Sequence, residues 1–179
     1  MKRYIALLRG INVSGKNKIS MSELKDGFTE LGFAEPATYL NSGNVIFSSD
    51  IDNSETLSNK IRLLIKDRFE LDIPVFVISK DLLEDIVNHA PAWWGDDDKE
   101  IYDNLIFLMS PLSYEEFYDE MGDPKEAYEK TYHYNNAVFW SFSRKDYRKT
   151  NWWSRTANSN ISGRITIRTA NTVRKIVGM

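Results

Sequence analysis

The sequence predicts an α+β protein in which one order of elements, βαββαβ, occurs twice along 179 residues. Three observations support this fold class. Apolar runs of strand length alternate with segments of helical periodicity, Ser–Glu pairs spaced for a capping box precede two of the helical segments, and Asn-containing turns join neighbouring strands in both halves. A chain of this length can bury one ordinary core or two small ones.

The first half ends at a strand that begins with a proline. In chain order its predicted elements are a strand at 4–8, a helix opened by Ser20 and Glu23, strands at 37–40 and 45–48, a helix across 57–69 and a strand at 74–78. The four residues Asn41-Ser42-Gly43-Asn44 tolerate positive φ and join the two middle strands as a hairpin. Gly32 is expected to end the first helix.

The second half repeats this order after a connecting helix. Its predicted elements are the connecting helix begun by Ser79, a strand at 105–109, a helix opened by Ser113 and Glu116, strands at 128–134 and 137–142, a helix across 150–160, a strand at 164–168 and a terminal helix from Asn171. We therefore predict two tandem ferredoxin-like (split βαβ) units, with domains at 1–78 and 79–179. A single larger α+β domain is the alternative.

Composition narrows the chemistry. The chain has no cysteine, which removes disulfides, thiol nucleophiles and thiolate metal sites, and its two histidines make the usual His-based sites improbable. We expect no cofactor and no metal. The first apolar run, residues 4–8, is too short for a signal-peptide core or a membrane span, so a cytoplasmic protein without a membrane partner is expected.

Charge is strongly segregated along the chain although the net charge is −3. Residues 1–25 carry six Lys or Arg against Glu23, and residues 144–179 carry nine against Asp146, so the two ends together hold +13 and the middle holds −16. Uneven surface solvation is the simple explanation. If the two ends meet in space, however, one face of the protein suits phosphate groups.

The loop at residues 9–18, Arg-Gly-Ile-Asn-Val-Ser-Gly-Lys-Asn-Lys, follows the first strand directly. In a split βαβ sheet the first strand is antiparallel to the third, so this loop and the turn at 41–44 should emerge at the same edge. Such an edge offers cations, amides and backbone N–H groups to an anion. The candidate ligand-binding residues there are Arg9, Asn12, Lys16, Asn17, Lys18, Ser42 and Asn44. The alternative is that the glycines shape a tight loop and the asparagines cap backbone groups.

Residues 10–16 also match the G-x-x-x-x-G-K part of a nucleotide-binding loop. Three features argue against a triphosphatase. Asn17 stands where Ser or Thr should hold magnesium, the capping box delays the helix to about Met21, and no apolar strand ends in the aspartate that binds the metal. A simpler anion site survives these objections, because it needs amides and positive charge alone.

Near the C-terminus, Arg168 shares a strand face with Thr166, and Asn171 and Thr172 stand at a helix start where N–H groups point outward. We add Arg168, Asn171 and Thr172 to the candidate ligand-binding residues. Arg168 suits bidentate phosphate or carboxylate binding, although pairing with a central carboxylate explains it slightly better.

Aromatic residues occupy both faces of the predicted strand 137–142. One face of such a sheet is covered by its own helices, so either Phe139 or the pair Trp140 and Phe142 needs another partner. Stacked bases are one option, and packing between domains or between two chains is the simpler one.

The chain also resembles a known family, the bacterial proteins grouped as domain of unknown function 1697. The resemblance is carried by YIALLRGINVSGKNK at 4–18, YLNSGNVIF at 39–47 and ITIRTANTV at 165–173. It implies an uncharacterised cytosolic α+β protein and no established activity, cofactor or catalytic residue.

These observations favour a protein that binds a phosphate-bearing partner, nucleic acid before a small metabolite, through the basic loop and the hairpin tip. Two alternatives stay open. One is an enzyme acting on a small phosphorylated or carboxylated metabolite, and the other is an interaction module that forms a homodimer through Phe139 or Trp140. The catalytic residues of an enzyme, if it is one, are unknown from the sequence.

Overall fold

The computed structural model describes all residues, 1–179, and the chain divides into two compact units. Unit 1 comprises Met1–Glu84 with Ile176–Met179, and unit 2 comprises Asp85–Lys175. The division falls inside the connecting helix α3 (Lys80–Asn88). Each unit is described by itself below.

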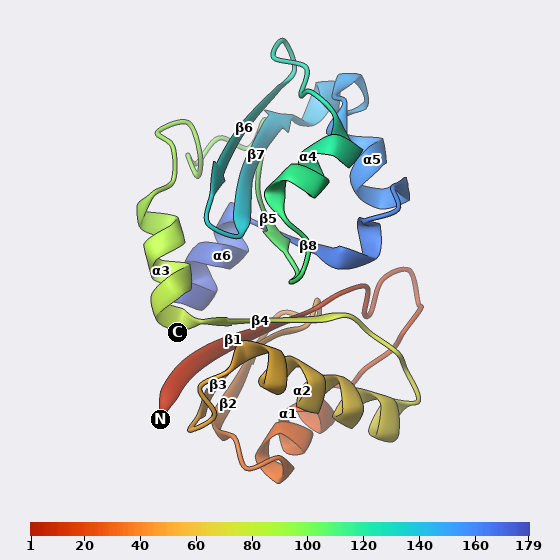
Figure 1. Cartoon of the computed structure of the whole chain (residues 1–179), viewed down its shortest axis with the longest axis vertical. Coiled ribbons are helices and arrows are strands. Elements are labelled where there is room, and N and C mark those ends of the chain that lie inside the picture. Colours follow the sequence, from red (N-terminus) through yellow and green to blue (C-terminus); the bar gives the residue numbers. More distant parts are fainter. The chain divides into compact units, whose positions relative to one another are not determined.

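Unit 1 contains one four-stranded antiparallel sheet with two helices on one face (Figure 1). Its elements are β1 (Lys2–Leu8), α1 (Met21–Glu30), β2 (Ala34–Tyr39), β3 (Asn44–Ser49), α2 (Ser54–Phe69) and β4 (Val75–Ser79). The strand order is β2-β3-β1-β4, which is the ferredoxin-like arrangement that the sequence predicts. As expected, β1 is antiparallel to β3, and Leu7 lies opposite Asn44.

Unit 2 repeats this arrangement. Its elements are β5 (Ile101–Leu108), α4 (Tyr114–Met121), β6 (Glu129–Tyr134), β7 (Ala137–Ser143), the 3₁₀ helix η1 (Arg144–Lys149), α5 (Trp152–Asn158), the 3₁₀ helix η2 (Ser162–Arg164), β8 (Ile165–Thr169) and α6 (Ala170–Val177). The sheet order β6-β7-β5-β8 matches that of unit 1 element by element. The prediction of two tandem ferredoxin-like units is confirmed.

The capping signals act as the sequence indicates. Ser20 Oγ accepts a hydrogen bond from Glu23 N at 3.3 Å and opens α1, and Ser113 Oγ accepts from Glu116 N at 3.1 Å and opens α4. Gly32 has φ +83° immediately after α1, a conformation that favours glycine. Local chemistry therefore sets these helix boundaries.

The structure differs from the predicted elements mainly in three places. β5 begins at Ile101, four residues before the start of the strand predicted at 105–109. β2 begins three residues early and contains an irregularity between Ala34 and Ala37, because Pro36 has no N–H for the ladder. The helix predicted across 150–160 is shorter, Trp152–Asn158, and η1 precedes it. A 3₁₀ helix of six residues is too short for the apolar periodicity that identifies a helix in a sequence.

Each sheet covers its own apolar core. In unit 1 the core joins Tyr4, Ala6 and Leu8 of β1 to Phe28 of α1 and Ile61 of α2, all with 2% exposure or less. In unit 2 the core combines fully or almost fully buried aromatic side chains, among them Phe117, Trp140 and Trp152, with aliphatic neighbours. Burial of these side chains from water is the main favourable contribution to folding in both units.

Candidate anion-binding site

The connection from β1 to α1 forms a short β-hairpin that projects from the sheet, which we call the basic arm (residues 9–19). Asn12 N donates to Asn17 O at 3.1 Å, and Lys16 N donates to Val13 O at 2.9 Å. The turn residues Ser14 and Gly15 both have positive φ, 51° and 75°, as in the type I′ turn that suits two-residue hairpins. The local fold is therefore a hairpin arm.

Two asparagine side chains hold the basic arm in shape. Asn12 Nδ2 donates to Ile19 O at 3.0 Å and to Asn41 O at 2.8 Å, and Asn12 Oδ1 accepts from Ile19 N at 2.9 Å. Asn17 Nδ2 donates to Gly10 O at 2.9 Å. Both amide hydrogens of Asn12 are thus used inside the chain, and the structure gives Asn12 and Asn17 a role in shaping the arm.

The turn at 41–44 lies beside the basic arm, as the topology predicts. Leu8 N donates to Gly43 O at 2.8 Å, and Asn12 links the arm directly to Asn41. Asn44 is fully buried, and its Nδ2 donates to Tyr39 O at 2.8 Å and to Ser42 Oγ at 3.0 Å. Asn44 therefore braces the turn from inside.

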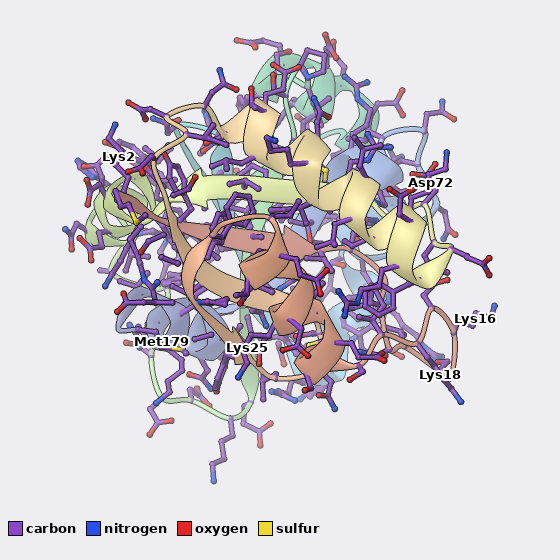
Figure 2. All side chains as sticks on the ribbon, turned by 90° about the horizontal axis from the view of Figure 1, so that it is seen from below. Lys2, Lys16, Lys18, Lys25, Asp72 and Met179 are labelled. Carbon is purple, nitrogen blue, oxygen red and sulfur yellow. The ribbon has the colours of Figure 1, made fainter.

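The cations of the basic arm divide into two kinds. Lys16 and Lys18 are exposed and form no ion pair, and Figure 2 shows both at the outer end of the arm, pointing away from the sheet. Arg9 is half-buried at the root of the arm, and burial lowers the pKa of its guanidinium. Lys16 and Lys18 are thus the groups that the arm presents to solvent.

The nucleotide-loop pattern at residues 10–16 has a different conformation here. In such a loop the lysine opens a helix, whereas Lys16 lies in the hairpin and its N–H is used by Val13 O. α1 begins at Met21, where the Ser20 cap places it. The pattern therefore does not form a triphosphate-binding loop.

The three candidate residues near the C-terminus lie in unit 2, at the junction of β8 and α6. Arg168 is 9% exposed, and its Nη1 donates to Thr166 Oγ1 at 3.0 Å and to Ile167 O at 2.9 Å, so the predicted shared face with Thr166 is present. Thr172 is 8% exposed, and its N–H donates to Thr169 Oγ1 at 3.4 Å. Asn171 is exposed on the first turn of α6.

The aromatic side chains of β7 are enclosed within the chain. Phe139 is fully buried, and the Trp94 ring contacts it edge to face at 5.0 Å. Trp140 is 2% exposed and packs against Phe142 and Trp152. Both rings are buried, so neither Phe139 nor Trp140 presents an exposed face on which a base or a second copy of the chain could pack.

A surface that lies outside the candidate ligand-binding residues predicted from the sequence is formed by η1 and α5, where the pair Trp152 and Trp153 could indicate either helix packing or a ligand wall. Trp153 is 42% exposed there, and Arg144 and Arg148 of η1 lie beside aromatic rings. The available signal was four basic residues within 144–149 closely followed by a Trp pair at 152–153. Periodicity alone does not reveal which of two adjacent tryptophans faces solvent.

Other kinds of site find little support in the geometry. No three His, Asp or Glu side chains are grouped so that they could hold a metal ion. A groove of about 440 Å³ between α1 and α2 is lined in part by Leu31, Leu63 and Leu64, and no residue of the basic arm lines it. None of the helices combines the length and the apolar character needed to span a bilayer.

Comparison with known proteins gives a family and a solved structure. Residues 1–139 match the model of a family described as "Protein of unknown function (DUF1697)". The chain is similar to the conserved bacterial protein SP0830 from Streptococcus pneumoniae, with 31% sequence identity, a TM-score of 0.85, and coverage of 99% of this chain and 97% of that one. No protein with a curated description matches. The chain therefore belongs to the DUF1697 family of proteins of unknown function.

Proposed function

We propose that the protein binds a phosphate-bearing polymer, nucleic acid in particular, and that the basic arm contacts the phosphate backbone. One observation carries the proposal: Lys16 and Lys18 are unpaired, exposed and presented by a hairpin that three side-chain hydrogen bonds of Asn12 hold in place. Cations that are ordered before binding lose less conformational entropy when an anion arrives. Phosphate contacts of this kind supply most of the non-specific affinity for nucleic acids.

The backbone at the tip of the basic arm supports the same partner. Ser14 and Gly15 are exposed, and their N–H groups are not used by the hairpin bonds, which involve Asn12 and Lys16. Backbone N–H groups in a turn with positive φ can donate to a phosphate oxygen beside a lysine. An arm that projects with its cations at the end fits an extended polyanion better than a small metabolite, which needs enclosure on several sides.

The test compares two double variants that remove equal charge from unit 1. Lys16→Ala/Lys18→Ala removes the arm lysines, and Lys60→Ala/Lys66→Ala removes two exposed lysines of α2 as the matched control. Binding of fluorescein-labelled duplex DNA is measured by anisotropy over a salt series. The arm variant should lower the slope of log K against log salt by about 1.8, because each lost phosphate contact changes it by about 0.9.

Three results would reject the proposal. These are no binding of the wild-type chain at low salt, binding that does not respond to salt, and equal effects of the two double variants. Asn12→Ala adds a finer test, because it loosens the arm and leaves every cation in place. We expect it to weaken binding by about 3- to 10-fold with an unchanged salt slope, the result of lost preorganisation.

A further inference from the structure

A row of aromatic rings with an exposed arginine at each end lies in unit 2, and it passes through the buried ring of Phe142. The Arg144 guanidinium lies 4.5 Å from the centre of the Tyr102 ring, and Tyr102 stacks on Phe142 with centroids 5.6 Å apart. The Trp153 ring meets Phe142 at 5.7 Å. The row continues through Tyr147 to Arg148, and we call these six residues the aromatic row.

Trp153 is the exposed centre of the aromatic row. Its ring meets Phe142 and Tyr147 edge to face, at interplanar angles of 73° and 69°, so two buried or half-buried rings fix its orientation. The side chain is nevertheless 42% exposed. An indole that is oriented by two neighbouring rings and is 42% exposed can serve as a stacking platform that loses little entropy when a base arrives.

The indole nitrogens show how Trp153 differs from the buried tryptophans. Trp94 Nε1 donates to Asn104 O at 2.8 Å, Trp140 Nε1 to Glu129 Oε1 at 3.1 Å, and Trp152 Nε1 to Gly122 O at 2.9 Å. Trp153 Nε1 has no partner in the chain. Its N–H group therefore adds a free donor to the exposed ring.

The arginines at the two ends of the aromatic row are positioned by aromatic side chains, and neither forms an ion pair. Arg148 Nε donates to Tyr147 Oη at 2.8 Å, and Arg144 stacks on Tyr102. Neither arginine, nor the neighbouring Lys145, lies within ion-pair distance of a carboxylate, whereas Lys149 pairs with Asp146 at 3.1 Å. Guanidinium groups held in this way can bind phosphate oxygens.

From this geometry we infer that the aromatic row binds single-stranded nucleic acid, with a base stacked on Trp153 and flanking phosphates bound by Arg144 and Arg148. A single strand is required because the bases of a duplex stack on one another and expose no free face. An acidic polypeptide would satisfy the cations and would leave the exposed indole without a use. This surface belongs to unit 2, so it is independent of the basic arm.

The experiment uses the full chain with a labelled oligothymidine strand, an abasic strand of equal length and a duplex. Trp153→Ala should weaken binding of the thymidine strand by about 5- to 100-fold and leave the abasic strand unaffected, because stacking needs a base. Trp153→Phe should restore most of the affinity. Tyr132→Ala, which removes a 45% exposed ring of β6 outside the aromatic row, is the matched control and should have no effect.

The arginines are tested through the salt series. Arg144→Ala and Arg148→Ala should each lower the salt slope for the single strand by about 0.7. The inference is overturned if the thymidine strand does not bind, if Trp153→Ala and Tyr132→Ala are equivalent, or if polyglutamate binds with the same dependence on Trp153. Lys16→Ala/Lys18→Ala separates the two proposals, since it should reduce binding of all three nucleic acids and leave the loss caused by Trp153→Ala unchanged.

Discussion

The two units have the same sheet and differ in which connection is elaborated. In unit 1 the link from β1 to α1 extends into the basic arm, and α2 is a regular helix, Ser54–Phe69. In unit 2 the link from β5 to α4 is short, whereas the link from β7 to β8 is divided into η1, α5 and η2. The exposed cations of the two proposed binding surfaces, Lys16 with Lys18 and Arg144 with Arg148, therefore lie on different connections. The two units thus have the same strand order, but different loops and connections carry their exposed charged and aromatic groups.

The groups that anchor these connections also differ. Neutral amides anchor the basic arm, whereas a buried carboxylate anchors the connection of unit 2. Glu129 is 3% exposed and accepts hydrogen bonds from Lys125 N, Asn151 N, Trp152 N and Trp140 Nε1. Two of these donors are backbone N–H groups at the start of α5, where a negative charge is favourable. The connection in unit 2 is thus held in place by a single residue, Glu129, more than the basic arm of unit 1 is held by any one of its side chains.

The largest expected effect comes from removing that carboxylate. Glu129→Ala should lower the free energy of unfolding by about 4 kcal/mol, because four donors lose their acceptor and two of them, Trp140 Nε1 and Trp152 N, are buried. Urea denaturation followed by tryptophan fluorescence measures it. Glu116→Ala is the control, since its half-exposed ion pair with Arg164 should be worth less than about 1 kcal/mol. Equal losses in the two variants would remove the contrast between the anchors.

The second prediction compares the turn at 41–44, which packs against Leu8 and Ile11, with the tip of the basic arm. A Cβ added to Gly43 would lie 2.7 Å from Leu8 Cβ and 2.9 Å from Ile11 Cδ1, and Gly43 has φ +87°. Gly43→Ala should therefore cost about 3 kcal/mol through strain and overpacking together. Gly15 has φ +75° with no atom within 4 Å of such a Cβ, so Gly15→Ala should cost about 1 kcal/mol. Thermal unfolding compares them, and a larger loss at Gly15 would contradict the description of a free tip.

The smallest effect concerns a tyrosine–aspartate pair in each unit. The Tyr118 hydroxyl donates to Asp123, and this bond raises the pKa of Tyr118 to about 12. In unit 1, Tyr4 donates to Asp52 at 3.1 Å, and burial is the first cause that raises the pKa of Tyr4. Asp123→Asn should therefore return the pKa of Tyr118 toward 10, whereas Asp52→Asn should leave the pKa of Tyr4 above its ordinary value. NMR titration of carbon-labelled tyrosine distinguishes the two.

The pH dependence of the Tyr118 bond follows from the direction of its shift. The folded state holds the phenol proton of Tyr118 more tightly than the unfolded chain does, because the tyrosine pKa in the unfolded chain is near 10. The bond therefore contributes its full stability below pH 10 and loses it as the pH rises toward 12. A stability difference between wild type and Asp123→Asn that grows from pH 10 to pH 12 would show the opposite sign and refute this assignment.

Much of the fold could be predicted because its signals are local. Strand alternation, the Ser20 and Ser113 caps, and the turn at 41–44 each act over a few residues, and these fixed the element order. The topology then placed the basic arm beside that turn, which the hydrogen bond from Asn12 to Asn41 confirms.

The orientation of polar and aromatic side chains could not be predicted in this way. Whether Asn44 faces solvent or Tyr39 O depends on the backbone that surrounds it, and whether Trp152 or Trp153 is buried depends on where α5 begins. Both orientations are decided by tertiary packing, and a segment this short shows no hydrophobic periodicity from which they could be predicted. The topology predicted where the candidate site lies. Only the three-dimensional structure shows that its lysines face solvent and that its asparagines form hydrogen bonds inside the chain.

In both units the last strand passes into a helix without an intervening loop. Ser79 Oγ accepts from Leu82 N at 3.2 Å, and Thr169 Oγ1 accepts from Thr172 N at 3.4 Å, so a hydroxyl closes each joint. Such a joint has no slack, since one inserted residue would rotate the following helix by about 100° about its axis. We therefore expect that the protein does not tolerate an inserted residue at either joint and tolerates one at Ser14, the tip of the basic arm. Each strand–helix pair, β4–α3 and β8–α6, should behave as one rigid segment.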